Sequence, residues 1–353
     1  MNLLKVTLYI AILTTLGYGC VKKPVFPHEE NNFQNEYKGL LIINEGLWQQ
    51  NNSTLTYYNP TSKVIQKNVF YLVNNQILGD TANDLLQVAD TLFIVVSTSN
   101  TIYKLNAKTL KIIQTLTISN GGDLRKMIYL SPHKAYISAL TGQKVWIINP
   151  SSMQVISSFY ASFPEAMALI HNKLYITQSN YPPNFKNKSL IVWDVQTDTK
   201  IKEILLPVEN ARHLAVDRLQ YLWVSCTGDY INPISAICKI NTNYDSIEVS
   251  VPISNNPTHI CSVQDTVYVM NDIGVFRYYS GLTAPQIWLN KSTYTELGEV
   301  FYNFYFDEVW QKWYIATSKQ FVYDGSILIF DRSRNLEHSF ISGLNPSVML
   351  HNR

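Results

Sequence analysis

Four cysteines, at positions 20, 226, 238 and 261, are the residues of this chain with the widest choice of chemistry. Cys226 and Cys238 lie on two predicted strands that flank one loop, so they could form a disulfide in an oxidising compartment. The interpretation that we favour is that they and Cys261 are small buried hydrophobic residues. No CxxC or HxxxH spacing indicates zinc, and neither a GxSxG motif nor a glycine-rich phosphate loop occurs. The sequence therefore predicts no catalytic residue, no metal site and no cofactor.

Polar side chains occupy the beginnings of six predicted strands: Asp84, Arg125, Glu165, Arg212, His259 and Glu299. A calcium site would need carboxylate and amide oxygens at such positions. Here acidic and basic residues are mixed, and too few carboxylates are adjacent to bind a divalent cation well. We expect Asp84, Arg125, Arg212 and His259 to contact a ligand instead.

Large aromatic residues are predicted on long loops at the same end of the strands: Trp48, Tyr181, Phe185, Tyr230, Phe321 and Tyr323. Asn, Gln and Arg are interleaved with them. This composition is typical of a surface that recognises a sizeable, partly planar ligand with amide groups. The alternative is that the rings pack against one another and make the loops rigid.

The composition excludes several classes of protein. The chain has 353 residues, of which 46% are hydrophobic and 15% charged, and its formal net charge is +2. A charge near zero argues against a strongly basic nucleic-acid binder. The apolar content excludes disorder for most of the chain, and the many Tyr, Asn, Thr and Ile residues favour strands.

The strands follow an internal repeat. Alternating apolar segments recur seven times, at intervals of 38 to 52 residues with a mean near 45, which is the length of a four-stranded propeller blade. The third strand of each copy is the clearest: TLTYYN (54–59), TIYKLN (101–106), KVWIIN (144–149), LIVWDV (190–195), AICKIN (236–241), GVFRYY (274–279) and SILIFD (326–331). A second strand precedes it, and a fourth, outer strand follows each turn. The sequence therefore predicts an all-β, seven-bladed propeller.

Six innermost strands are recognisable along the chain: 84–90, 124–131, 165–172, 211–218, 257–264 and 299–306. The C-terminal segment PSVMLHNR (346–353) has no blade of its own, so we expect it to supply the inner strand of blade 1. This pairing would close the ring and leave no long unprotected edge. Between blades we expect a core of alternate strand residues: Phe93, Val95, Tyr136, Tyr175, Trp223, Tyr268 and Tyr314.

The first residues are predicted to direct the chain to the cell envelope. Lys5, an uncharged apolar run from Val6 to Leu16, and small residues before Cys20 form a signal peptide over residues 1–19. The junction resembles the lipobox of bacterial lipoproteins, which implies a lipid on Cys20. Residues 20–38 then form a flexible, Pro-containing tether, and residues 39–353 the propeller.

Two segments carry a family resemblance: NEGLWQQNNSTLTYYN (44–59) and DTLFIVVSTSNTIYKLNAKTLKIIQTL (90–116). With the lipoprotein-like start, they make residues 39–353 resemble the YncE-like "surface layer" propeller lipoproteins of Gram-negative bacteria, and within them the BtuG type. The resemblance implies a lipid-anchored, non-catalytic outer-membrane protein that captures cobalamin for an outer-membrane transporter. The expected location is the cell surface, with the periplasmic face of the membrane as the alternative. The ligand contacts that we expect come from loop geometry alone: Trp48, Asp84, Arg125, Tyr181, Arg212, Tyr230, His259, Phe321 and Tyr323.

Three interpretations of function remain at this point. The first is capture of a corrinoid or a similar macrocycle for a transporter. The second is a protein-interaction scaffold without a small ligand, which mutually buried loop aromatics would favour. The third is a lactonase-like or quinoprotein-like enzyme, which would need a metal or cofactor that no spacing in the sequence supports.

Overall fold

The computed structural model describes residues 36–181, 186–229 and 234–353. The predicted signal peptide, Cys20 and most of the tether lie outside these residues, as do Phe185 and Tyr230. Within the described ranges, no helix has both the length and the apolar character needed to cross a bilayer.

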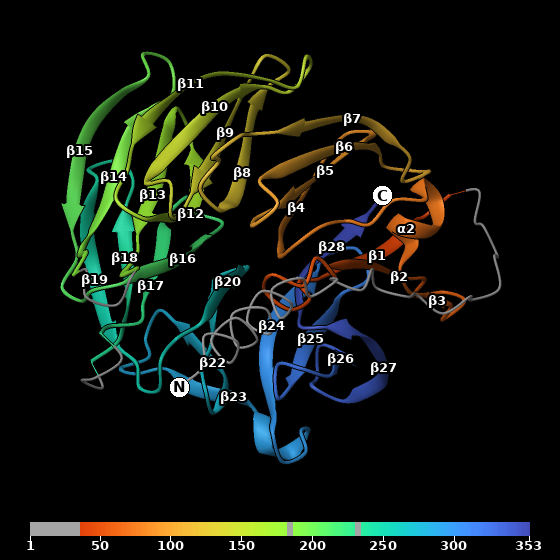
Figure 1. Ribbon diagram of the computed structural model, residues 1–353. Helices are drawn as coiled ribbons and strands as arrows, with labels where there is room; N and C mark the ends of the chain where they lie inside the picture. Colours follow the sequence, from red (N-terminus) through yellow and green to blue (C-terminus); the bar gives the residue numbers. More distant parts are fainter. Residues whose placement is uncertain (1–35, 182–185, 230–233) are drawn as a thin grey trace, which may run out of the picture. The chain divides into compact units, whose positions relative to one another are not determined.

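Seven antiparallel sheets of four strands form the blades, as the repeat predicts (Figure 1). From the inner to the outer strand, blade 1 consists of β28 (Pro346–Asn352), β1 (Gly39–Asn44), β2 (Thr54–Tyr58) and β3 (Ile65–Gln66). Blade 2 consists of β4 (Ala82–Val88), β5 (Thr91–Val96), β6 (Thr101–Asn106) and β7 (Ile112–Thr117). Blade 3 consists of β8 (Leu124–Ser131), β9 (Lys134–Ala139), β10 (Lys144–Asn149) and β11 (Gln154–Tyr160), and blade 4 of β12 (Pro164–Ile170), β13 (Lys173–Gln178), β14 (Ser189–Asp194) and β15 (Thr199–Leu205).

Blades 5 to 7 follow the same order. Blade 5 consists of β16 (Ala211–Val216), β17 (Leu222–Cys226), β18 (Ala236–Asn241) and β19 (Ser246–Pro252). Blade 6 consists of β20 (His259–Val263), β21 (Thr266–Met270), β22 (Gly274–Tyr279) and β23 (Gln286–Asn290). Blade 7 consists of β24 (Glu299–Asp307), β25 (Lys312–Lys319), β26 (Asp324–Phe330) and β27 (Leu336–Leu344). A short 3-10 helix, η1 (Lys291–Thr293), joins blades 6 and 7. Each inner strand contacts the inner strands of both neighbouring blades, so the seven surround a common axis.

The ring closes as predicted, because the C-terminal strand β28 pairs antiparallel with β1 (Figure 1). Beyond the ladder, the side-chain amide of Asn352 donates to the backbone oxygens of Tyr37 and Ala107, at 2.6 and 2.7 Å. Asn345 donates to the backbone oxygen of Gly46 at 3.0 Å. The two ends of the described chain are therefore tied to each other by side chains as well as by the sheet.

The core consists of one apolar cluster between each pair of neighbouring blades. The predicted residues Phe93 and Val95 pack against blade 3, Tyr136 against blade 4 and Tyr175 against blade 5. Cys226 and Cys238 are buried free thiols in the cluster between blades 4 and 5, and Cys261 is a half-buried free thiol.

Blade 1 departs from the predicted pattern at its outer edge. The expected fourth strand is reduced to the two residues of β3, and a helix, α2 (Val69–Asn74), follows it. Val69 and Phe70 of this helix are buried in the cluster between blades 1 and 2. The run VFYLV is apolar in either conformation, so its alternation alone could not distinguish a strand from a buried helical turn.

Candidate functional site

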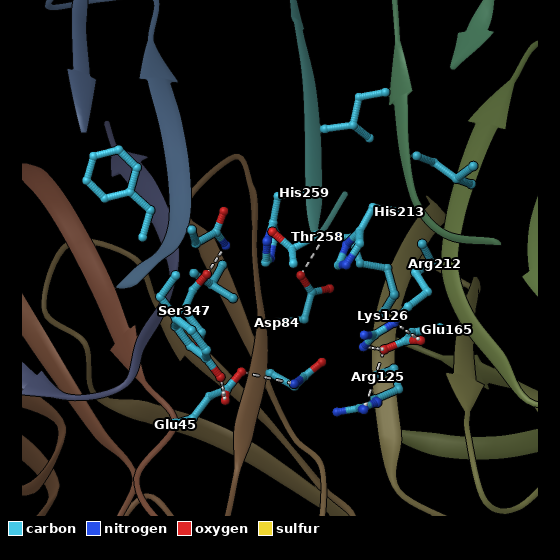
Figure 2. Close-up of a pocket in the computed structure, with 18 of the residues that line it drawn as sticks. Glu45, Asp84, Arg125, Lys126, Glu165, Arg212, His213, Thr258, His259 and Ser347 are labelled. Atoms are coloured by element: carbon cyan, nitrogen blue, oxygen red, sulfur yellow. Dashed lines mark hydrogen bonds and ion pairs between the residues drawn. The ribbon is translucent and has the colours of Figure 1, made fainter. Parts of the chain in front are cut away.

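A cavity of about 550 Å³ opens where the inner strands begin, at the centre of the ring (Figure 2). All seven inner strands or the residues just before them contribute to its wall. The polar lining residues are Glu45, Asn83, Asp84, Arg125, Lys126, Glu165, Arg212, His213, Thr258, His259, Asp272, Tyr302, Asn303 and Ser347. The inner strands all run in the same direction along the axis, so their first residues lie together around this one opening.

β-Bulges at the starts of six inner strands turn extra side chains toward the cavity. In β8, for example, Leu124 pairs with Ala139 and Met127 with Ile137, so Arg125 and Lys126 together face one partner residue. Similar shifts occur near the start of β4, β12, β16, β24 and β28. A bulge breaks the strict alternation of a strand, so two consecutive residues can both line the site.

Hydroxyl groups on the second strand stabilise two of these bulges. Oγ of Ser138 accepts a hydrogen bond from the backbone N–H of Lys126 at 3.1 Å. Oγ1 of Thr177 accepts one from the backbone N–H of Ala166 at 2.8 Å. The ladder leaves these N–H groups unpaired, so a small hydroxyl residue at this position supports the bulge.

Glu165 is held between two guanidinium groups on the cavity wall. Nε and Nη2 of Arg212 donate to its two oxygens at 3.0 and 2.8 Å, and Nη2 of Arg125 lies 3.5 Å away. Burial alone would raise the pKa of the Glu165 carboxyl, but Arg212 and Arg125 outweigh burial and hold that pKa well below 4.5. One carboxylate thus contacts two cations on this side of the cavity.

A second ion pair joins blades 2 and 3. The Asp84 carboxylate, which is 1% exposed, accepts from Nζ of Lys126 at 2.6 Å and from the backbone N–H of Met127 at 2.8 Å. Both carboxylate oxygens are engaged, so Asp84 positions the start of β8 in addition to facing the cavity.

Glu45, from the loop after β1, forms a third polar contact. Its carboxylate accepts from the Tyr302 hydroxyl at 2.6 Å. Burial raises the pKa of Glu45 above 4.5, although the bond from Tyr302 acts in the opposite direction. Burial and the Glu45 carboxylate in turn raise the pKa of Tyr302 well above 10.0. This pair places two hydrogen-bonded polar groups on the cavity wall.

His213 and His259 stand side by side, with ring centroids 4.4 Å apart (Figure 2). Burial, followed by the charges of His259 and Arg212, lowers the pKa of His213 well below 6.5. Burial and Arg212 lower the pKa of His259 to about 3. Both rings are therefore neutral at pH 7.

The structure brings together five of the residues predicted for the site: Asp84, Arg125, Arg212, His259 and Phe321 all line the cavity. Trp48, Tyr181 and Tyr323 do not line it. They lie on the loops between the second and third strands of blades 1, 4 and 7 and are 69%, 47% and 57% exposed. Phe321 is 50% exposed and makes an edge contact with Tyr302, with ring centroids 6.0 Å apart. Tyr230 lies outside the described residues.

Sequence reasoning missed most of the remaining polar wall, including Glu45, Lys126, His213 and Tyr302. It noted Glu165 only as a poor calcium ligand, and Glu299 does not line the cavity. One feature of the sequence could have indicated some of the missed positions. Three second strands carry a small hydroxyl residue opposite the bulge, namely Ser138, Thr177 and Ser225.

Residues 38–331 match the model of a family described as "Domain of unknown function (DUF5074)". No curated protein matched the chain.

Several solved structures are similar in fold. A quinonprotein alcohol dehydrogenase-like protein from Bacteroides thetaiotaomicron has a TM-score of 0.72 and 15% identity over 91% of this chain and 79% of its own. A functionally unknown protein from Desulfotomaculum acetoxidans has a TM-score of 0.65 and 10% identity, over 88% and 98% of the two chains. Hydrazine synthase of Kuenenia stuttgartiensis has a TM-score of 0.59 and 12% identity, over 69% and 73%. At such identities the likeness shows the fold alone.

Proposed function

Since this chain belongs to the DUF5074 family, whose description assigns no function, we propose a function from the site: non-catalytic capture of a large ligand at the mouth of the central cavity. The observation that carries the proposal is a charged cavity surrounded by loops with exposed aromatic rings. The ligand that we expect is cobalamin or a related corrinoid, which the protein would pass to an outer-membrane transporter. The resemblance to YncE-like lipoproteins of the BtuG type supports this choice.

The charge arrangement favours a ligand that presents acceptor oxygens. Glu165 is shared between two arginines, and Arg125 makes the longer contact with it, at 3.5 Å. A guanidinium that is only partly paired binds amide, carboxylate or phosphate oxygens well. The Glu45 and Tyr302 pair offers hydrogen-bonding groups on the opposite wall. Amide side chains around a macrocycle would satisfy both sides.

The exposed rings favour an extended apolar surface on the same ligand. Trp48, Phe321 and Tyr323 are each at least half exposed, so they are not buried against one another, as a rigid loop scaffold would require. Aromatic side chains supply large contact areas at low cost in conformational entropy. A cavity of about 550 Å³ accommodates part of a large ligand, and the rim aromatics can cover the rest.

Replacing Phe321 by Ala should weaken corrinoid binding about thirtyfold, or about 2 kcal/mol, because Phe321 both lines the cavity and exposes half of its ring. Trp48→Ala should also weaken binding, because Trp48 is an exposed aromatic residue on a loop beside the cavity. Titration calorimetry of the purified protein with cobalamin measures both effects. The matched control is Tyr244→Ala, because Tyr244 is similarly exposed but lies on a turn at the other end of the strands. If no corrinoid gives heat, the interaction scaffold becomes the better interpretation, and if all variants bind equally, the site lies elsewhere.

Cys20→Ser should move the protein from the outer-membrane fraction to the soluble fraction. The sequence places a small residue before Cys20 and a polar tether after it, which suits lipid attachment to the cysteine thiol. Fractionation and intact mass measure the change. If the Ser variant stays in the same fraction and its mass differs from the wild type only by the side-chain change, Cys20 carries no lipid. That result would contradict the anchor but would leave the ligand proposal untouched.

A further inference from the structure

The two imidazole rings in the cavity have no hydrogen-bond partner among the residues that the structure describes. His213 and His259 come from β16 and β20 of neighbouring blades, and their ring planes make an angle of 33° (Figure 2). Nδ1 of His259 is buried without a partner. Both residues line the cavity. Each neutral ring therefore keeps one nitrogen lone pair that no described residue uses.

Nε of Arg125 and Oγ of Ser347, which also line the cavity, are likewise buried without a partner, whereas the nearby carboxylates are paired. The oxygens of Asp84 and Glu165 are occupied by Lys126, Arg212 and a backbone N–H. On the opposite face of the ring, His351 is hydrogen-bonded through Nδ1 to Asp307 at 2.7 Å. A confined polar atom without a partner destabilises the fold, because it has lost its hydrogen bonds to water. A group from outside the chain would give these imidazoles, and the other unpartnered atoms of the cavity wall, their missing partners.

We propose that His213 and His259 together bind a transition metal of borderline softness. This metal has two adjacent coordination positions that the two imidazole nitrogens can occupy. Imidazole nitrogen is a preferred ligand of Ni²⁺, Cu²⁺, Zn²⁺ and Fe. The metal can be an aquated ion or the metal of a chelate. In the described part of the chain, no three His, Cys, Asp or Glu residues gather to hold a metal. The remaining coordination positions therefore belong to water or to the chelate.

The geometry of the pair suits two adjacent positions on one metal. Two nitrogens that are each about 2.1 Å from a metal in adjacent positions lie about 3 Å apart. Ring centroids 4.4 Å apart, with planes tilted by 33°, are compatible with one metal bound to a nitrogen of each ring. This inference does not depend on the corrinoid proposal, because neither a corrin nor the rim aromatics take part in it.

The test uses two probes, NiCl₂ and Ni²⁺–nitrilotriacetate, with the untagged protein at pH 7.5. The nitrilotriacetate complex presents two open adjacent positions, whereas the aquated ion presents more. Calorimetry and the visible absorption of Ni²⁺ report binding. We expect one site, with affinity at least tenfold lower in His213→Gln and in His259→Gln and with no site in the double variant.

His133→Gln is the matched control, because His133 is an exposed turn residue outside the cavity. Thermal unfolding of each variant checks that the fold is intact. Binding of the chelate alone, or of both probes, with dependence on both histidines supports the proposal and identifies the source of the metal. Binding that survives both substitutions, or no binding of either probe by the wild type, overturns it. Neither result bears on Phe321→Ala, so the two proposals fail separately.

Discussion

Deleting residues 346–353 should abolish cooperative folding of the propeller at 25 °C. The deletion removes β28 and leaves the backbone of β1 without its inner partner, along Gly39–Asn44. It also removes Met349 from the cluster between blades 7 and 1 and Asn352 from its bonds to Tyr37 and Ala107. Losing several buried residues at a few kcal/mol each exceeds the roughly 5 to 15 kcal/mol that typically stabilises a domain. Circular dichroism during thermal unfolding measures the loss.

The control for this deletion removes Arg353 alone, because Arg353 is exposed and takes no part in the β1–β28 ladder. That variant should unfold at the wild-type temperature. Adding a synthetic peptide of residues 346–353 to the truncated chain should restore part of the transition, since it supplies the same backbone partners. A truncated protein with native stability would show that blade 1 does not need β28.

Glu165→Gln should destabilise the protein by about 3 kcal/mol at pH 7, the second largest effect that we expect. The substitution removes the carboxylate that both Arg125 and Arg212 contact, and so leaves two cations close together on a largely buried wall. Chemical denaturation compared with the wild type measures the difference. Glu203→Gln is the control, because Glu203 pairs with Lys200 on an exposed outer strand and should change stability by less than about 0.5 kcal/mol.

The same variant should show a defined pH dependence. The folded-state pKa of Glu165 is lowered from 4.5, so its contribution to stability is complete above pH 4.5 and is lost as the pH falls toward the folded-state pKa. The glutamine side chain of the variant does not titrate, so the gap between wild type and variant should be constant from pH 7 to pH 5 and should narrow below pH 4.5. A gap that stays constant to pH 3, or that is absent at pH 7, would show that the arginines do not depend on this carboxylate.

Much of the fold follows from local patterns. Alternation of apolar residues predicts the strands, because successive side chains of a strand point to opposite faces. The interval near 45 residues predicts the blades, and the partnerless strand at 346–353 predicts the closure with β1. The short β3 and α2 escape prediction because Val69 and Phe70 are buried by their neighbours in blade 2, which no local pattern shows.

Part of the candidate site could also be predicted from the sequence, and part could not. The repeat shows which positions begin the inner strands, and this was enough to predict that Asp84, Arg125, Arg212 and His259 line the site. The alternation of the strands could not place Lys126 and His213 beside them, because bulges at the strand starts interrupt that alternation in the folded protein. The tertiary structure also determines which charges meet, since the Glu165 and Arg212 contact links two blades. Such pairings depend on how the blades close around the axis, and that arrangement is set by the packed ring as a whole.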